Sequence, residues 1–214
     1  MSLILGVDTS TVVCAGVARD GVAVASGSID DPRAHAEQLM PLVRSVLADA
    51  GVDLHDLTGI TVGVGPGPFT GLRVGVVTAA TLGEVLGVPV VGVCSLDVVA
   101  KQWADAGAPE EFVVALDARR KEVYWARYVA GQRVEGPSVT SAADVPDLPA
   151  AGPGAGLLGR PGAGPQTLDA GVLAASELPE VGLEPLYLRR PDAEVATRRK
   201  STLTPQRSGL RRTR

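Results

Sequence analysis

The chain has 214 residues, of which 45% are hydrophobic, so it is long enough to bury a real core in one or two domains. Aromatic residues make up only 3%, which excludes an aromatic platform for stacking bases. The formal charge of −4 is uneven: residues 198–214 hold seven basic and no acidic side chains, which leaves −11 on residues 1–197 and makes them a poor nucleic-acid surface by themselves.

The first half of the chain alternates between strand-like and helix-like patterns. Apolar runs predict three consecutive strands, and later apolar residues repeat at helical spacing. The expected elements are strands at 3–7, 12–18 and 22–28, a helix at 33–50, a strand at 60–64, a helix at 70–86, a strand at 90–93 and a helix at 96–106. Pro41 should kink the first helix or mark where regular helix begins. This βββαβαβα order predicts an α/β fold with a mixed sheet, as in a ribonuclease-H-like domain.

The second half has a weaker pattern. Strands are expected at 112–116 and 122–129, joined by a turn that holds Asp117, Arg119, Arg120 and Glu122. Prolines and glycines then become frequent, and only a short strand near 157–158 and a helix near 170–175 are predicted. The expected organisation is an N-terminal lobe (1–107), a reduced C-terminal lobe (108–191) and a basic, unstructured tail (192–214).

Six stretches of the chain resemble the TsaB (YeaZ) family of tRNA threonylcarbamoyladenosine biosynthesis. They are ILGVDTST (4–11), HAEQLMPLV (35–43), GVGPGPFTGLRVGVVTA (63–79), VGVCSLDVVA (91–100), ALDARRKEVYWARY (115–128) and PLYLRRP (185–191). The resemblance implies the two-lobed actin-like ATPase (ASKHA) fold with a truncated second lobe.

In that family the protein is not the catalytic subunit. The resemblance implies a cytoplasmic subunit that binds and supports a TsaD-type transferase, with a TsaE-type ATPase joining the assembly and self-association as an alternative. The chain would contact tRNA indirectly, through its partners, or directly through the basic tail. No cofactor is implied.

The helix expected at 70–86 carries a stripe of small residues. Gly71, Gly75, Ala79 and Gly83 are four apart and therefore share one face. Each glycine inside a helix costs about 0.8–1.0 kcal/mol relative to alanine, so close packing must offset the cost. The surface packed against this stripe could be the chain's own sheet, its first helix or another subunit.

The resemblance implies that the partner binds through the helices at 33–50 and 70–86. The interface candidates are His35, Leu39, Leu42, Val46, Gly71, Arg73, Gly75, Ala79 and Gly83.

Two features could instead belong to an actin-fold ATPase or kinase. Asp8, Thr9 and Ser10 stand where such enzymes have their first phosphate loop, although a tight turn between two strands is the explanation that the sequence favours. The loop before the second helix resembles a phosphate cradle, but Pro66 and Pro68 lack the N–H donors that a cradle needs. A vestigial phosphate loop is the interpretation that the sequence favours.

Metal chemistry is not expected. In TsaD-type subunits two histidines four residues apart hold a metal, whereas Ser95 and Val99 occupy the matching positions here. His35 and His55 are twenty residues apart on different elements, which argues against a metallopeptidase-like protein. The start of the chain has no basic leader, and no run of eighteen apolar residues appears, so neither a signal peptide nor a membrane span is expected.

Overall fold

The computed structural model describes residues 1–30 and 35–189. Its elements follow the predicted βββαβαβα order through the first half of the chain. They are β1 (Leu3–Asp8), β2 (Val13–Arg19), β3 (Val22–Ile29), α1 (His35–Asp49), the 3-10 helix η1 (Leu54–Asp56), β4 (Gly59–Gly63), α2 (Phe69–Leu86), β5 (Val90–Val93) and α3 (Ser95–Asp105). Helix α1 continues through Pro41. The predicted start of α1 at 33–34 and the predicted tail lie outside the described residues.

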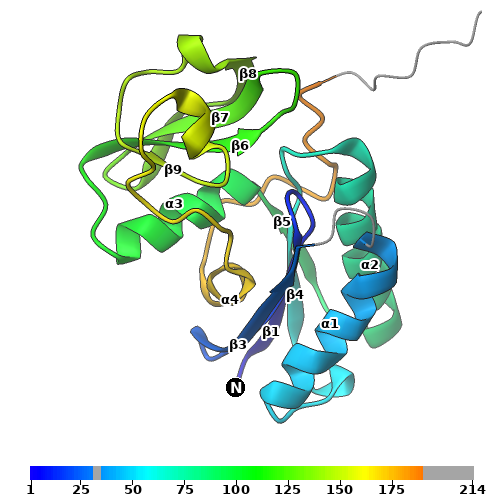
Figure 1. Cartoon of the computed structure of the whole chain (residues 1–214). Coiled ribbons are helices and arrows are strands. Elements are labelled where there is room, and N and C mark those ends of the chain that lie inside the picture. Colours follow the sequence, from blue (N-terminus) through cyan, green and yellow to red (C-terminus); the bar gives the residue numbers. More distant parts are fainter. Residues whose placement is uncertain (31–34, 190–214) are drawn as a thin grey trace, which may run out of the picture.

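The first sheet has the strand order β3-β2-β1-β4-β5 (Figure 1). β1, β2 and β3 pair antiparallel, while β4 lies parallel to β1 and β5 parallel to β4. Hairpins join the antiparallel strands, and the helices α1 and α2 lead into the parallel ones. This is the ribonuclease-H-like arrangement that the element order predicted.

Helices cover both faces of this sheet. α1 and α2 pack on one face, over Leu5 and Val7 of β1. The short helix α4 (Ala170–Ala175) lies on the other face, where a Cβ on Gly6 or Gly16 would collide with its backbone. Glycine is therefore required on this side of β1 and β2, and the sheet buries both faces.

The second sheet has the order β8-β7-β6-β9. Its strands are β6 (Glu111–Asp117), β7 (Glu122–Val129), β8 (Gln132–Ser141) and β9 (Ala150–Ala151), with the 3-10 helices η2 (Ala142–Asp144) and η3 (Ala155–Leu158) around β9. The prediction of β7 and α4 is confirmed, whereas β8 was not predicted. The strand expected near 157–158 is wrong, because these residues lie in η3 and the short strand is at 150–151.

The segment after α4 returns to the first sheet. Val181 N donates to Gly92 O (2.9 Å) and Leu186 N donates to Val64 O (2.8 Å). This C-terminal segment (176–189) therefore runs beside the loop that begins α2, and it ends near the second sheet (Figure 1). The division into lobes at residue 107 stays a prediction.

Candidate functional site

Asp8 ends β1 in a fully buried hydrogen-bond network. Its Oδ1 accepts from Ser10 N (2.7 Å) and Ser10 Oγ (2.6 Å), and its Oδ2 accepts from Ser95 Oγ (2.5 Å). Ser95 Oγ in turn accepts from Gly65 N (3.1 Å). The network ties β1, the loop before α2 and the start of α3 together.

Burial controls the chemistry of this network. It raises the pKa of the Asp8 carboxyl, while the hydrogen bonds from Ser10 and Ser95 oppose the rise. Asp8 and Thr9 are 0% exposed and Ser10 is 1% exposed. In this arrangement the three residues form a buried turn between β1 and β2.

Thr9 holds α2 against the sheet. Its Oγ1 donates to Gly71 O (2.7 Å) and accepts from Gly75 N (3.1 Å). A Cβ on Gly75 would overlap Thr9 Oγ1, and one on Gly83 would overlap Val90 Cγ2. The glycines therefore allow α2 to approach β1, β4 and β5 of its own chain.

The small-residue stripe consequently faces inward. Gly71, Gly75, Ala79 and Gly83 are buried inside the chain, as are the interface candidates Leu39, Leu42 and Val46 of α1. Of the three surfaces considered for the stripe, the structure places it on the chain's own sheet. These seven residues pack α1 and α2 onto the sheet. A partner that docks on the outer face of the helices would therefore contact other side chains. The side chain of His35 lies outside what the structure describes.

The outward face of α2 carries a different row, also four residues apart. Phe69, Arg73, Val77, Thr81 and Val85 are all exposed, and Val77 and Val85 remain 60% and 73% accessible. We call this row the α2 ridge. Arg73 lies over the Phe69 ring, with Cζ 5.1 Å from its centroid. Arg73 is the one residue of the predicted interface set that the structure describes as exposed.

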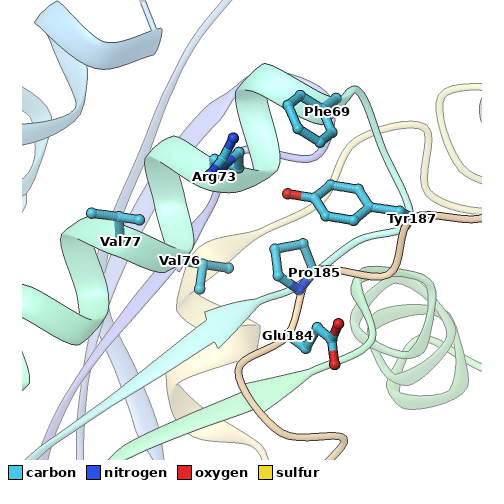
Figure 2. A pocket seen from close by; sticks show the side chains of 7 residues that line it. All are labelled: Phe69, Arg73, Val76, Val77, Glu184, Pro185 and Tyr187. Atoms are coloured by element: carbon cyan, nitrogen blue, oxygen red, sulfur yellow. The ribbon is translucent and has the colours of Figure 1, made fainter. Parts of the chain in front are cut away.

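A hollow lies on each side of the ridge. The first, of about 390 Å³, separates Phe69, Arg73 and Val76 of α2 from Glu184, Pro185 and Tyr187 of the C-terminal segment (Figure 2). The Phe69 and Tyr187 rings lie 4.8 Å apart at one end of it. The second hollow, of about 430 Å³, lies on the side of α1 and is lined by Ala36, Thr70 and Val74. The ridge and its two hollows form a largely apolar surface on the outside of α2.

α2 is also long and apolar enough to cross a membrane by length and composition, the one such helix among residues 1–30 and 35–189. Counting consecutive apolar residues did not reveal this property. In the structure α2 packs its glycine face on β4 and leaves the opposite face exposed. Two rows of residues therefore make α2 apolar: the buried small-residue stripe and the exposed α2 ridge.

A second polar cluster, which sequence reasoning missed, joins α3 to the second sheet. Asp97 Oδ1 accepts from Tyr128 Oη (2.8 Å) and lies 3.0 Å from Arg133 Nε. Burial raises the pKa of Asp97, and burial with the neighbouring carboxylate raises that of Tyr128. The three residues come from α3, β7 and β8, so no spacing in the sequence marks them as a cluster.

Metal-binding residues do not come together in the described part of the chain. No group of three or more His, Cys, Asp and Glu side chains in it could hold a metal ion. Ser95 is bonded to Asp8, Val99 is buried and His55 lies exposed on η1. Cys14 and Cys94 are buried free thiols, and burial raises the pKa of Cys94 to about 12.

Comparisons with known proteins relate the chain to the same family that its sequence motifs resemble. Residues 30–157 match the family model described as TsaD, tRNA N6-adenosine threonylcarbamoyltransferase. An uncharacterised protein of Mycobacterium tuberculosis is 46% identical over 205 residues, covering 91% of this chain and 95% of that protein. The tRNA threonylcarbamoyladenosine biosynthesis protein TsaB of Escherichia coli is 37% identical over 127 residues, which are 58% of this chain and 54% of that protein.

Solved structures agree with the sequence relatives. The structure of YeaZ from Pseudomonas aeruginosa has a TM-score of 0.66 at 30% identity, covering 82% of this chain and 90% of that one. Another Pseudomonas aeruginosa structure, described as similar to peptidase YEAZ, has a TM-score of 0.73 at 30% identity, with 88% and 100% covered. The predicted fold class, an actin-like, ribonuclease-H-like α/β fold, is confirmed.

Proposed function

Because the chain belongs to the TsaB (YeaZ) family, we propose that it acts in threonylcarbamoyladenosine biosynthesis of tRNA as a non-catalytic subunit that binds a TsaD-type transferase. A role on tRNA places it in the cytoplasm. A TsaE-type ATPase joins the assembly, and a second copy of the chain competes for the same surface when the transferase is absent.

The observation that carries this proposal is the α2 ridge. Its inward stripe is locked on the sheet by Thr9, while Phe69, Val77 and Val85 stay exposed on a rigid helix. Exposed apolar patches beside hollows are typical of protein interfaces, where one partner's side chain fills the other's hollow. Phe69 and Arg73 line both hollows, and aromatic residues and arginines are common among the residues that dominate binding.

The match to the transferase model indicates the kind of partner. Residues 30–157, which include α1 and α2, resemble the transferase itself. Two related folds can therefore meet through equivalent helices, in the manner of a symmetric dimer. A TsaD-type subunit presents such a helix pair, and this favours it over an unrelated protein.

Two places in the chain support a non-catalytic role: the positions that match the metal ligands of the transferase, and the turn at Asp8. By the family resemblance, Ser95 and Val99 stand where a TsaD-type transferase has metal-binding histidines, and a valine side chain cannot ligate a metal. Both carboxylate oxygens of Asp8 accept hydrogen bonds from Ser10 and Ser95 within the core. The chain thus supplies a surface, and the partner supplies the chemistry.

Size-exclusion chromatography with light scattering tests the proposal, using the chain with the TsaD-type subunit of its own organism. Val77→Glu places a charge at the centre of the ridge and should abolish the heterodimer. Val134→Glu is the matched control, because Val134 is 50% exposed on β8, away from α2. Failure of the wild-type chain to bind the transferase, or equal binding by both variants, would refute the proposed function.

A further inference from the structure

Arg73 stands on the α2 ridge with its charge unpaired. It is exposed, one helical turn beyond Phe69. Among the residues that the structure describes it makes no hydrogen bond or ion pair, and its guanidinium contacts the Phe69 ring. Glu184 lines the same hollow at its other end and makes no ion pair with Arg73 (Figure 2).

Several other basic side chains already have carboxylate partners on the chain's own surface. Arg127, Arg160 and Arg189 each pair with an acidic side chain of a neighbouring strand or loop, and Lys101 pairs with one on its own helix. Arg73 differs from them, because its N–H donors have no acceptor in the described part of the chain. They are therefore available to a group from outside the chain.

Two aromatic rings hold the Arg73 guanidinium in place. The rings of Phe69 and Tyr187 lie 4.8 Å apart with 32° between their planes, and Arg73 Cζ lies 5.1 Å from the centroid of Phe69. A cation at this distance is attracted by the face of the ring. A guanidinium that is ordered in advance loses less conformational entropy when it binds.

The surrounding charges favour a carboxylate at this end of the ridge. The N-cap residue of α2, Pro68, gives no side-chain hydrogen bond to the first N–H groups of the helix. Pro68 and Thr70 are exposed, so the positive end of the helix dipole faces solvent about one turn from Arg73. Residues 1–197 are acidic as a whole, and the other charged side chain of α2, Glu84, lies near the far end of the helix. A carboxylate is therefore attracted to Arg73 and repelled by most of the remaining surface.

We infer that Arg73 determines the specificity of the α2 ridge by binding a carboxylate of the transferase, an aspartate or glutamate side chain surrounded by apolar ones. The inference rests on the proposed function. Apolar side chains of the partner fill the hollows beside Arg73, and a bidentate pair with the guanidinium fixes the orientation of the two subunits. A guanidinium also binds phosphate, but Phe69, Val77 and Pro185 beside it are apolar, which suits a protein surface better than a nucleic acid.

Isothermal titration calorimetry of the chain with the TsaD-type subunit of its own organism, at several salt concentrations, tests the inference. Arg73→Met keeps an unbranched side chain over Phe69 and removes the charge. It should weaken binding by about 10- to 150-fold and reduce the salt dependence, because a charged hydrogen-bonded pair is lost. Arg73→Lys keeps the charge without the planar fork and should lose less. Both variants should melt at the wild-type temperature, because Arg73 is exposed and makes no hydrogen bond to a described residue.

Lys101→Gln is the matched control, because it removes one positive charge from α3, outside the ridge. It should bind the transferase within about twofold of the wild type. Unchanged binding by Arg73→Met, or an equal loss in the control, would overturn the inference. So would full affinity of Arg73→Met for the transferase together with a loss of tRNA binding.

Neutralising the exposed carboxylates of the transferase one at a time identifies the partner side chain. One such variant should weaken binding of the wild-type chain and add no further loss to Arg73→Met. Additive losses for every carboxylate would refute the inference. If the wild-type chain does not bind the transferase, the proposed function itself fails, whereas a heterodimer that forms equally well with Arg73→Met refutes only the inference.

Discussion

Replacing Gly75 by alanine tests whether the small-residue stripe serves the chain's own core or a partner. The new Cβ would overlap Thr9 Oγ1, the hydroxyl that bonds Gly71 O and Gly75 N. Thr9 is fully buried, short and β-branched, so its hydroxyl can leave only by giving up both hydrogen bonds.

The expected magnitude follows from three contributions. Two buried hydrogen bonds contribute about 0.5–1.5 kcal/mol each. Overpacking of a rigid core costs a further 1–3 kcal/mol, roughly. The higher helix propensity of alanine returns about 0.8–1.0 kcal/mol. We therefore expect Gly75→Ala to lower the free energy of unfolding by about 1–5 kcal/mol.

Urea denaturation of the single variants and of Thr9→Ala/Gly75→Ala completes a double-mutant cycle. Without Oγ1 the new methyl group has room, so in that background Gly75→Ala should cost nothing or should stabilise by up to about 1 kcal/mol. Additivity within about 0.5 kcal/mol would contradict the contact. A variant of unchanged stability that no longer binds the transferase would show that the stripe faces the partner, against our reasoning.

Three further predictions concern the buried polar groups. Burial raises the pKa of the Asp8 carboxyl, so Asp8 contributes most to stability below the ordinary carboxyl pKa. This contribution falls as the pH rises through the raised pKa, and the free energy of unfolding decreases by at most about 1.4 kcal/mol per pH unit. Over this pH range the wild type should lose stability relative to Asp8→Asn, measured as the difference between their free energies of unfolding. A flat or opposite trend would refute the raised pKa of Asp8. Magnesium and ATP should leave the melting temperature unchanged, since Asp8 and its two neighbours in the turn are buried, whereas a bound nucleotide at 100 times its Kd would add about 2.7 kcal/mol and raise the melting temperature by several degrees. Tyr128→Phe should lower the unfolding free energy by about 1.5–3 kcal/mol, because the buried Asp97 carboxylate loses a hydrogen bond of 2.8 Å, and a loss below about 0.5 kcal/mol in urea denaturation would show that this bond contributes little.

Local patterns were sufficient for most of the elements. Helical spacing of apolar residues predicted α2 to within one residue of its observed start, and a run of strand formers predicted β7 with its observed bounds. These signals depend on residues within one element, so they survive without knowledge of the fold. The order of the elements then limited the first sheet to a ribonuclease-H-like arrangement.

Elements without such a pattern were missed or misplaced. β8 contains Gly136 and Pro137, and its pairing with β7 shifts register twice, so it shows no clean alternation. β9 has only two residues, and its pairing with Val113 and Val114 of β6 defines it as a strand. The apolar pair at 157–158 looks more like a strand by composition than Ala150 and Ala151 do.

The candidate site divides in the same way. The sequence by itself determined that Gly71, Gly75, Ala79 and Gly83 share one face of a helix, because spacing along a helix is a local property. Only the tertiary structure decided that Thr9, sixty-six residues before Gly75, lies against that face and turns the opposite row outward. The contact of Arg189 with the turn after β6 is likewise set by distant segments. Such contacts depend on how the layers pack together, and no pattern within a single element records that packing.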